Sequence, residues 1–205
     1  MTKYEKKEVI EKLEAGLKSG LWNCHVPGLH SVILEEKLDG SLVRIFFTDS
    51  RHRLNELFTP TGHFTLGAHN HDKELCFTSL YGDVLNVDVV LSRLAPNTLY
   101  QYDFQSALTT GEFSLGAPKM VGAIILVRPI DGVCMQPESV HTVLVNTPHA
   151  AWLVEEGPTV PLQKQIYSPR EDLQLSKEGL YQSMSERNLT DIQQILLENI
   201  RNAEN

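Results

Sequence analysis

Two histidines separated by one residue are the clearest chemical feature of this sequence. His69 and His71 lie in residues 67–77, which read GAHNHDKELCF. On an extended strand, side chains alternate between the two faces, so both imidazoles would point the same way. Neutral imidazole is a good ligand for Fe, Mn, Ni, Cu or Zn. The spacing favours one metal ion held by both rings, although a His-x-His pair also occurs by chance in proteins without a metal.

A third histidine stands in a second suggestive segment. Residues 132–143 read GVCMQPESVHTV, which describes a turn, a short strand, a corner at Pro137, and His141 opening the next strand. In an antiparallel barrel such a histidine can face inward, opposite the first pair. The other five histidines have no partner at metal-ligand spacing, and we interpret them as surface or turn residues: His25, His30, His52, His63 and His149.

Short apolar runs surround these segments and are typical of strands. An Asp39-Gly40 step between two such runs predicts a β-hairpin. Many short strands at regular spacing favour an antiparallel sandwich or barrel, and no long helical pattern occurs between residues 30 and 165. The predicted strands cover residues 31–37, 42–48, 75–80, 84–91, 98–104, 121–127, 133–136, 140–145 and 151–155.

Each end of the chain has the pattern of an amphipathic helix. Residues 2–19 carry one apolar stripe, with Thr2 and Glu5 as a candidate capping box. A second stripe follows Thr190, which with Gln193 would form another capping box. We therefore expect an N-terminal helical extension (1–28), a β-domain (29–160), and a connector with a C-terminal helix (161–205).

Composition excludes several classes of protein. The 205 residues are 41% hydrophobic and 21% charged, which is ordinary for a globular chain, and the formal net charge is −8. Without a basic block or an apolar run of about 20 residues, we expect neither nucleic-acid binding nor a membrane span. The N-terminus lacks the apolar core of a signal peptide, so the three cysteines are expected to be reduced thiols in the cytoplasm.

The two histidine segments resemble the two motifs of the cupin superfamily. The residues that carry the first motif are Gly62 or Gly67, His69, His71, Glu74 and Gly82, and those of the second are Gly132, Pro137, His141 and Asn146. The resemblance spans roughly residues 30–156 and implies a mainly β protein, a cupin-like jelly-roll barrel that holds one divalent metal ion. It also implies that His69, His71 and His141 bind the ion, with Glu74 as a fourth ligand. Ser139 stands where the family has glycine.

The first motif is also similar to that of thiol dioxygenases of the cysteine dioxygenase type, which bind Fe(II) with three histidines. In those enzymes the His-x-His pair is followed by Cys-Phe and a glycine, here Cys76, Phe77 and Gly82. The resemblance implies a tyrosine linked to Cys76, and an arginine that binds the substrate carboxylate. Arg44 precedes His69 by 25 residues, the separation that the family shows. The first tyrosine after His141 is Tyr167, later than in the family.

These observations predict a metal-dependent cupin enzyme, an Fe(II) dioxygenase that oxidises a small thiol or acid. Arg44, Cys76 and Tyr102 are the candidate catalytic residues, Tyr102 as a hydrogen-bond donor on an alternating strand. Zn, Ni or Mn are alternative metals. One alternative function is a cupin that binds a metal or small ligand without oxygen chemistry, as an isomerase or sensor. Another is a barrel without metal that serves dimerisation, because edge strands or end helices can form a homodimer.

Overall fold

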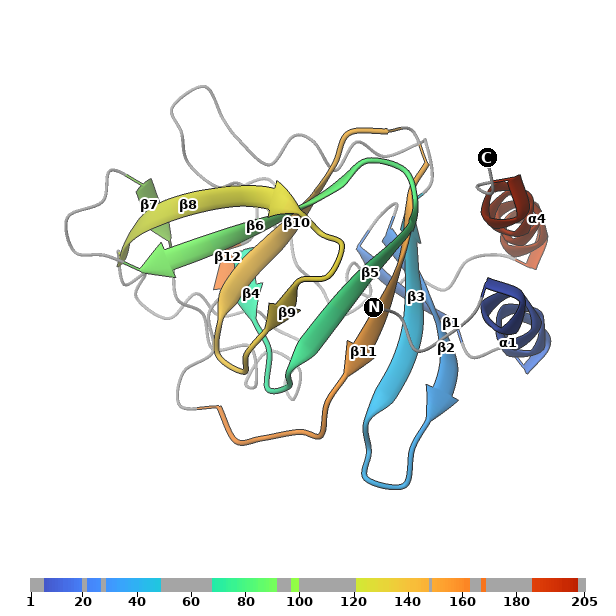
Figure 1. Cartoon of the computed structure of the whole chain (residues 1–205), viewed down its shortest axis with the longest axis horizontal. Coiled ribbons are helices and arrows are strands. Elements are labelled where there is room, and N and C mark those ends of the chain that lie inside the picture. The colour runs from blue at the N-terminus through green and yellow to red at the C-terminus, as the bar shows by residue number, and fades with distance from the viewer. Residues whose placement is uncertain are drawn as a thin grey trace.

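The described residues form two antiparallel β-sheets and two helices (Figure 1). The computed structural model describes residues 6–19, 22–26, 29–48, 68–91, 97–99, 121–147, 149–162, 167–168 and 186–202. Sheet I has the strand order β1-β2-β3-β11-β5-β9, and sheet II has the order β12-β4-β10-β6-β8-β7. Within these ranges no strand of sheet I pairs with a strand of sheet II. The expected mainly β fold is confirmed, but the two sheets do not close into one barrel.

Most of the predicted strands are present. Sheet I contains β1 (Trp22–Val26), β2 (Leu29–Glu36), β3 (Leu42–Thr48), β5 (Leu75–Tyr81), β9 (Cys134–Met135) and β11 (Ala151–Glu156). Sheet II contains β4 (Ala68–Asn70), β6 (Val84–Leu91), β7 (Asn97–Leu99), β8 (Val121–Pro129), β10 (Val140–Val145) and β12 (Tyr167–Ser168). The sequence patterns missed β1, β4 and β12, of which β4 and β12 are too short to show an alternation.

The hairpin predicted at Asp39-Gly40 is confirmed. Strands β2 and β3 pair antiparallel on either side of it. Gly40 has a φ of +79°, a left-handed conformation that glycine adopts without steric cost. The Asp39 carboxylate accepts hydrogen bonds from the backbone nitrogen and the hydroxyl of Ser41, which closes the turn and lowers the pKa of Asp39 below its usual value.

Both helices pack on the outer face of sheet I (Figure 1). Helix α1 spans Lys6–Ser19 and helix α4 spans Glu186–Asn202. Thr190 therefore lies inside α4, and its predicted role as a helix cap is wrong. A buried cluster joins the helices to the sheet: Val9, Leu13, Val32, Val43, Ile45, Phe47, Ala151, Leu153, Leu196 and Ile200. An ion pair of 2.7 Å between Arg201 and Glu14 links the two helices at the surface.

A second apolar cluster fills the space between the two sheets. Sheet I contributes Phe77 and Trp152 to it, and sheet II contributes Val84 and Val145. The alternation of β3 explains the division between the two clusters, because Val43, Ile45 and Phe47 face the helices while Phe46 faces the other sheet. Side chains on the inner faces of both sheets therefore meet in one interior layer, and this layer is where a site enclosed by the fold must lie.

The chain crosses from sheet I to sheet II at Gly82, between β5 and β6. Gly82 has a φ of +85°, and a Cβ there would lie 2.7 Å from the Cβ of Ala150. Both the backbone conformation and the close approach require glycine at this crossing. The resemblance placed the last glycine of the first motif at this residue.

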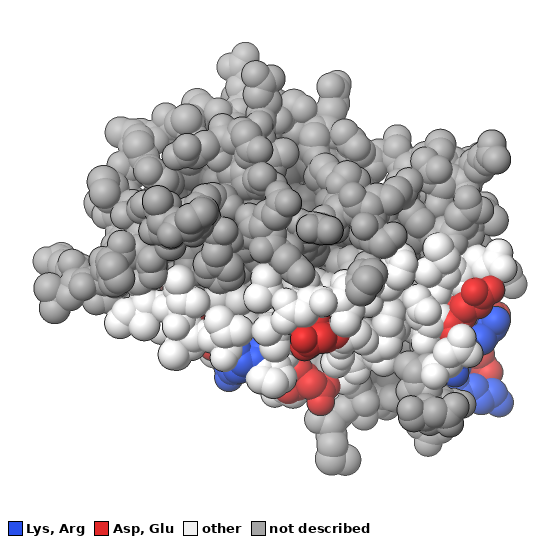
Figure 2. Space-filling view, turned by 90° about the horizontal axis from the view of Figure 1, so that it is seen from above, with Lys and Arg blue, Asp and Glu red and all other residues white. Residues whose placement is uncertain are grey.

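Neither α1 nor α4 has the length and apolar character needed to cross a membrane. On the face shown in Figure 2, acidic and basic side chains of the described residues lie next to one another rather than in patches of one sign.

Candidate metal site

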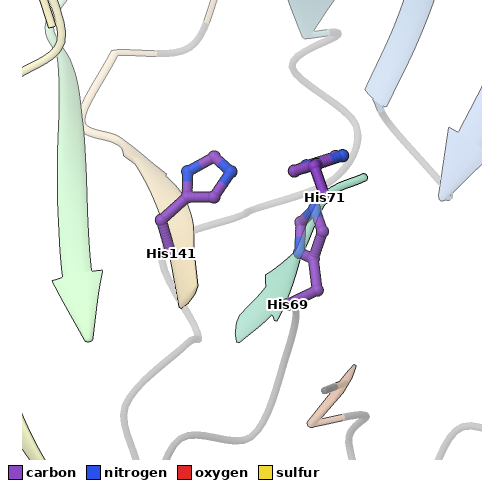
Figure 3. A group of neighbouring side chains, drawn as sticks. All are labelled: His69, His71 and His141. Carbon is purple, nitrogen blue, oxygen red and sulfur yellow. The ribbon is translucent and has the colours of Figure 1, made fainter. Parts of the chain in front are cut away.

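The structure brings the three predicted histidines together (Figure 3). One ring nitrogen of each of His69, His71 and His141 lies within 4.8 Å of those of the other two. The ring centroids are 4.6 Å apart for His69 and His71, and 5.3 Å apart for each of these with His141. This spacing lets one metal ion accept all three nitrogens after small side-chain rotations, since metal–nitrogen bonds measure about 2.0–2.1 Å for zinc.

Strand register explains why His69 and His141, 72 positions apart, meet. Strands β4 and β10 pair antiparallel in sheet II, with His69 directly opposite His141. Residues directly opposite on neighbouring strands project from the same face, so both rings share one side of the sheet. The ring of Phe77, from β5 of sheet I, lies 5.5 Å from that of His141. The histidines therefore face the interior layer between the two sheets.

A turn before β10 fixes the position of His71. The backbone nitrogen of Glu138 donates a hydrogen bond of 2.9 Å to the carbonyl oxygen of His71, just beyond the end of β4. Glu138 has a φ of +67° in the turn closed by the bond from the nitrogen of Ser139 to the carbonyl of Gln136. A side chain at positive φ costs about 1 kcal/mol or more. This strained turn ties the loop carrying His71 to the strand carrying His141.

The environment of His141 keeps its ring neutral. Its side chain is buried, and burial, together with the charge of nearby His69, lowers the pKa of His141 to about 3. Its Nδ1 lies 3.2 Å from Oδ1 of Asn86, while its Nε2 is buried with no hydrogen-bond partner among the described residues. A buried ring nitrogen that has no partner among the described residues and faces two further imidazoles fits a metal ligand. The donor set is three imidazole nitrogens.

The lowered pKa of His141 predicts a pH-dependent stability of the metal-free protein. Between pH 6.5 and about 3 the unfolded chain binds a proton at His141 that the folded chain excludes. Stability is therefore retained above pH 6.5 and falls as the pH drops, by about 1.4 kcal/mol per pH unit for one proton. We expect urea unfolding from pH 6.5 to 4.5 to show this slope, and His141→Gln to lack that one-proton contribution. Parallel curves for the two proteins would contradict the lowered pKa.

Glu74 lies outside the group of three histidines. Its side chain is exposed, and its Oε1 accepts a hydrogen bond of 2.6 Å from Nε2 of Gln136 on the exposed side of the β5–β9 pair. Glu74 precedes β5 instead of continuing β4, so it does not follow the alternation that places His69 and His71 on one face. The structure does not bring it to the other predicted ligands.

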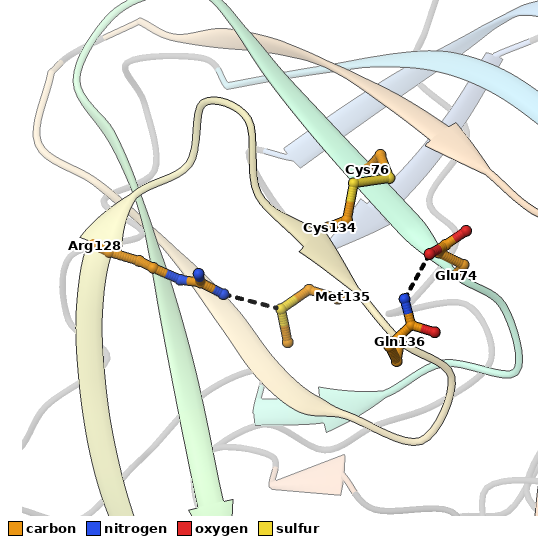
Figure 4. Close-up of a disulfide and its surroundings, with 6 residues drawn as sticks. All are labelled: Glu74, Cys76, Arg128, Cys134, Met135 and Gln136. Carbon is orange, nitrogen blue, oxygen red and sulfur yellow. Dashed lines mark hydrogen bonds between the residues drawn. A yellow bond between two sulfur atoms is a disulfide. The ribbon is translucent and has the colours of Figure 1, made fainter. Parts of the chain in front are cut away.

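Cys76 is bonded to Cys134 (Figure 4), so the expectation of reduced thiols is wrong for this pair. The two residues are opposite each other in the β5–β9 ladder, and their Cα atoms are 4.1 Å apart. A disulfide across 58 residues stabilises a fold by about 2–4 kcal/mol. Cys76 in this state offers no thiol for a link to a tyrosine.

Arg44 projects into the interior layer. In sheet I it shares a row with Val154 and Phe77, both of which belong to the cluster between the sheets. Its Nε lies 2.6 Å from Oε1 of Glu156, and Nζ of Lys73 lies 3.1 Å from Oε2 of the same carboxylate. The three side chains are 10–18% exposed. They form a largely buried cluster with two positive charges and one negative charge.

Tyr102, the third candidate catalytic residue, lies outside the described residues.

The sequence patterns missed Asn86, which is fully buried and contacts His141. A signal for it exists, because Asn86 and Asp88 interrupt the apolar residues of β6 at alternate positions. Tyr167 is a second residue of interest, since its backbone pairs with His69 across β12 and β4.

Comparisons with known proteins do not identify the function of this chain. No family model matches the sequence, and no curated protein matches it. Among solved structures, FeII HppE superposes with a TM-score of 0.33 and 10% sequence identity. The match covers 63% of this chain and 50% of that protein, so this chain spans half of its length. A likeness at this score supports no functional argument, and the function must be inferred from the three histidines.

Proposed function

We propose that this protein is a metal-dependent enzyme of the cupin type, in which His69, His71 and His141 hold one Fe(II) ion and dioxygen oxidises a small acid. The observation that supports the proposal is the convergence of three imidazole nitrogens in the interior layer, where the buried Nε2 of His141 has no hydrogen-bond partner among the described residues. Two packed antiparallel sheets are also the layers from which a jelly roll is made.

Iron held by three nitrogens would supply Lewis acidity and one-electron chemistry, with coordination positions left for substrate and dioxygen. The chain's own residues would create the surroundings for this chemistry. Phe77 packs against His141 and, with the apolar cluster between the sheets, excludes water from one side of the site. Exclusion of water strengthens every electrostatic interaction inside the site.

The cluster of Arg44, Glu156 and Lys73 favours an anionic substrate. Its formal charges sum to +1, and Arg44 lies on the inner face of sheet I, two strands from Phe77. That separation is roughly 10 Å at the usual strand spacing. A carboxylate of the substrate would compete with Glu156 for the guanidinium of Arg44 and the ammonium of Lys73. Arg44 could therefore bind substrate even though it is paired with Glu156.

A small thiol also belongs to this substrate class. Cys76 gives no further support for a thiol substrate, because it is bonded to Cys134 in a disulfide. The same donor set also suits zinc, which three histidines bind in hydrolytic sites. Because Glu74 does not join the histidines, a zinc centre acting on a carbonyl or on bound water is the second candidate.

Oxygen consumption distinguishes the two functions. We expect protein loaded anaerobically with Fe(II) to consume dioxygen when a substrate from a panel of small thiols and carboxylic acids is added. Protein loaded with Zn(II) is the matched control and should consume none. Iron-loaded protein that consumes no dioxygen with any member of the panel would count against the dioxygenase and favour the zinc candidate.

A further inference from the structure

Three polar side chains form a continuous network beside His141. The network lies on the side of the ring that faces away from His69 and His71. Asn86 contacts His141, Asp88 contacts Asn86, and Arg128 on β8 forms an ion pair of 2.8 Å with Asp88. We propose that Asn86 is a positioning residue that selects the ring tautomer of His141, and that Asp88 and Arg128 fix the orientation of Asn86. The metal-binding part of this inference rests on the proposed function.

The orientation of the Asn86 amide follows from its neighbours. Its Nδ2 lies against Oδ1 of Asp88 and 3.8 Å from the sulfur of Met135. A carboxylate paired with arginine and a thioether both accept hydrogen bonds, so the amide nitrogen must face them. The opposite orientation would set the Asn86 oxygen against the Asp88 carboxylate. The amide oxygen is therefore the atom that faces Nδ1 of His141.

The tautomer of His141 follows from that orientation. An amide oxygen only accepts, so the contact of 3.2 Å is a hydrogen bond only if Nδ1 of His141 carries the proton. A neutral imidazole has one N–H, which leaves the lone pair on Nε2, the nitrogen for which the described part of the chain offers no partner. Asn86 is 0% exposed, so water does not compete for this hydrogen bond. Without the Asn86 oxygen, the ring could protonate either nitrogen.

The network ends at the surface with Arg128. Its side chain is 48% exposed, and its guanidinium pairs with Asp88 and also lies 3.8 Å from the sulfur of Met135 (Figure 4). The cross-strand register accounts for the arrangement, because Asp88 lies opposite His141 and Asn86 lies opposite Arg128. Asn86, Asp88 and Arg128 thus project from the same face of sheet II as His141 and determine which of its nitrogens is free.

Nitrogen NMR of the histidine rings tests the tautomer without any metal. In the metal-free wild type we expect the Nδ1–H form of His141, with Nε2 unprotonated. Asn86→Leu keeps the branched shape of the side chain but has no acceptor, and should produce the Nε2–H form or a mixture. The double variant Asn86→Asp with Asp88→Asn keeps an acceptor against His141, keeps the bond between the two positions and leaves the net charge unchanged. It should restore the wild-type tautomer.

Metal affinity gives the second readout. Loss of the hydrogen-bond partner of a ligand histidine weakens metal binding by about 10–100-fold. We expect Asn86→Leu to weaken Co(II) binding by this factor and to alter the visible spectrum of bound cobalt, and the double variant to recover both. Wild-type tautomer, affinity and spectrum in folded Asn86→Leu would overturn the inference. If that variant does not fold, Asp88→Asn alone must shift the tautomer or the spectrum, or the inference fails.

The two proposals fail in different ways. A wild-type protein that shows the Nδ1–H tautomer but binds no cobalt would remove the metal site and leave the role of Asn86 in place. A wild type that binds cobalt, with an Nε2–H ring in the metal-free state, would remove the role of Asn86 and leave the metal site.

Discussion

We expect His141→Ala to abolish metal retention. Removing one of three nitrogens leaves the His69–His71 pair, and it also replaces a buried imidazole by a cavity beside Phe77. The affinity should fall by more than the roughly 10–100-fold that follows loss of a ligand's hydrogen-bond partner. Metal content after purification, measured by elemental analysis, should drop from about one ion per chain to nearly none.

His149→Ala is the matched control for this substitution. His149 is half-buried, and its Nδ1 lies 3.4 Å from the backbone oxygen of Thr48, away from the three histidines. It should retain metal at the wild-type level. Unchanged metal content in folded His141→Ala protein would remove His141 from the site, and with it the proposed iron chemistry.

Glu156→Gln should be the most destabilising single substitution in the buried charge cluster. Glu156 is the only negative charge among the three members, so its loss leaves Arg44 and Lys73 close together without a counter-ion. Breaking a fully buried pair costs about 3–5 kcal/mol, and the partial exposure of these side chains lowers the expected cost to about 2–3 kcal/mol. Urea unfolding at neutral pH measures it.

Three comparisons separate this effect from a general loss of packing. Arg44→Met should cost less than Glu156→Gln, because Lys73 remains paired with Glu156. Sulfate should restore part of the stability of Glu156→Gln, since an anion can replace the missing carboxylate. Glu155→Gln, the next position on β11, should stay within about 0.5 kcal/mol of the wild type. Equal costs for Glu156→Gln and Glu155→Gln would show that the cluster contributes no special stability.

Local patterns were sufficient to predict most of the elements and the pair of His69 and His71. The alternation of β-branched and polar residues identified most strands, and the Asp39-Gly40 turn identified a hairpin whose register follows from the turn itself. The His-x-His spacing placed two rings on one face for the same reason. His141 needed the resemblance to a family, because spacing alone could not show that β10 pairs with β4.

Features that depend on the register between distant strands could not be predicted. Cys76 and Cys134 pair only because β9 lies beside β5, and nothing in the composition indicates that arrangement. The role of Asn86 depends on β6 lying beside β10, with Asp88 opposite His141. Arg44 was expected to be available for a substrate, but Glu156 is a residue of β11 that the fold brings alongside β3. Whether the sheets close depends on their edge strands, which local alternation does not determine.

X-ray absorption at the metal edge of the purified protein tests most directly whether His69, His71 and His141 hold one iron ion. It reports which metal is present, how much of it, and which atoms surround it. We expect one iron ion per chain with three imidazole nitrogens among its ligands, and no sulfur ligand from the protein. Protein that holds no metal after purification and after loading with Fe(II), or an ion surrounded by oxygen atoms alone, would contradict it.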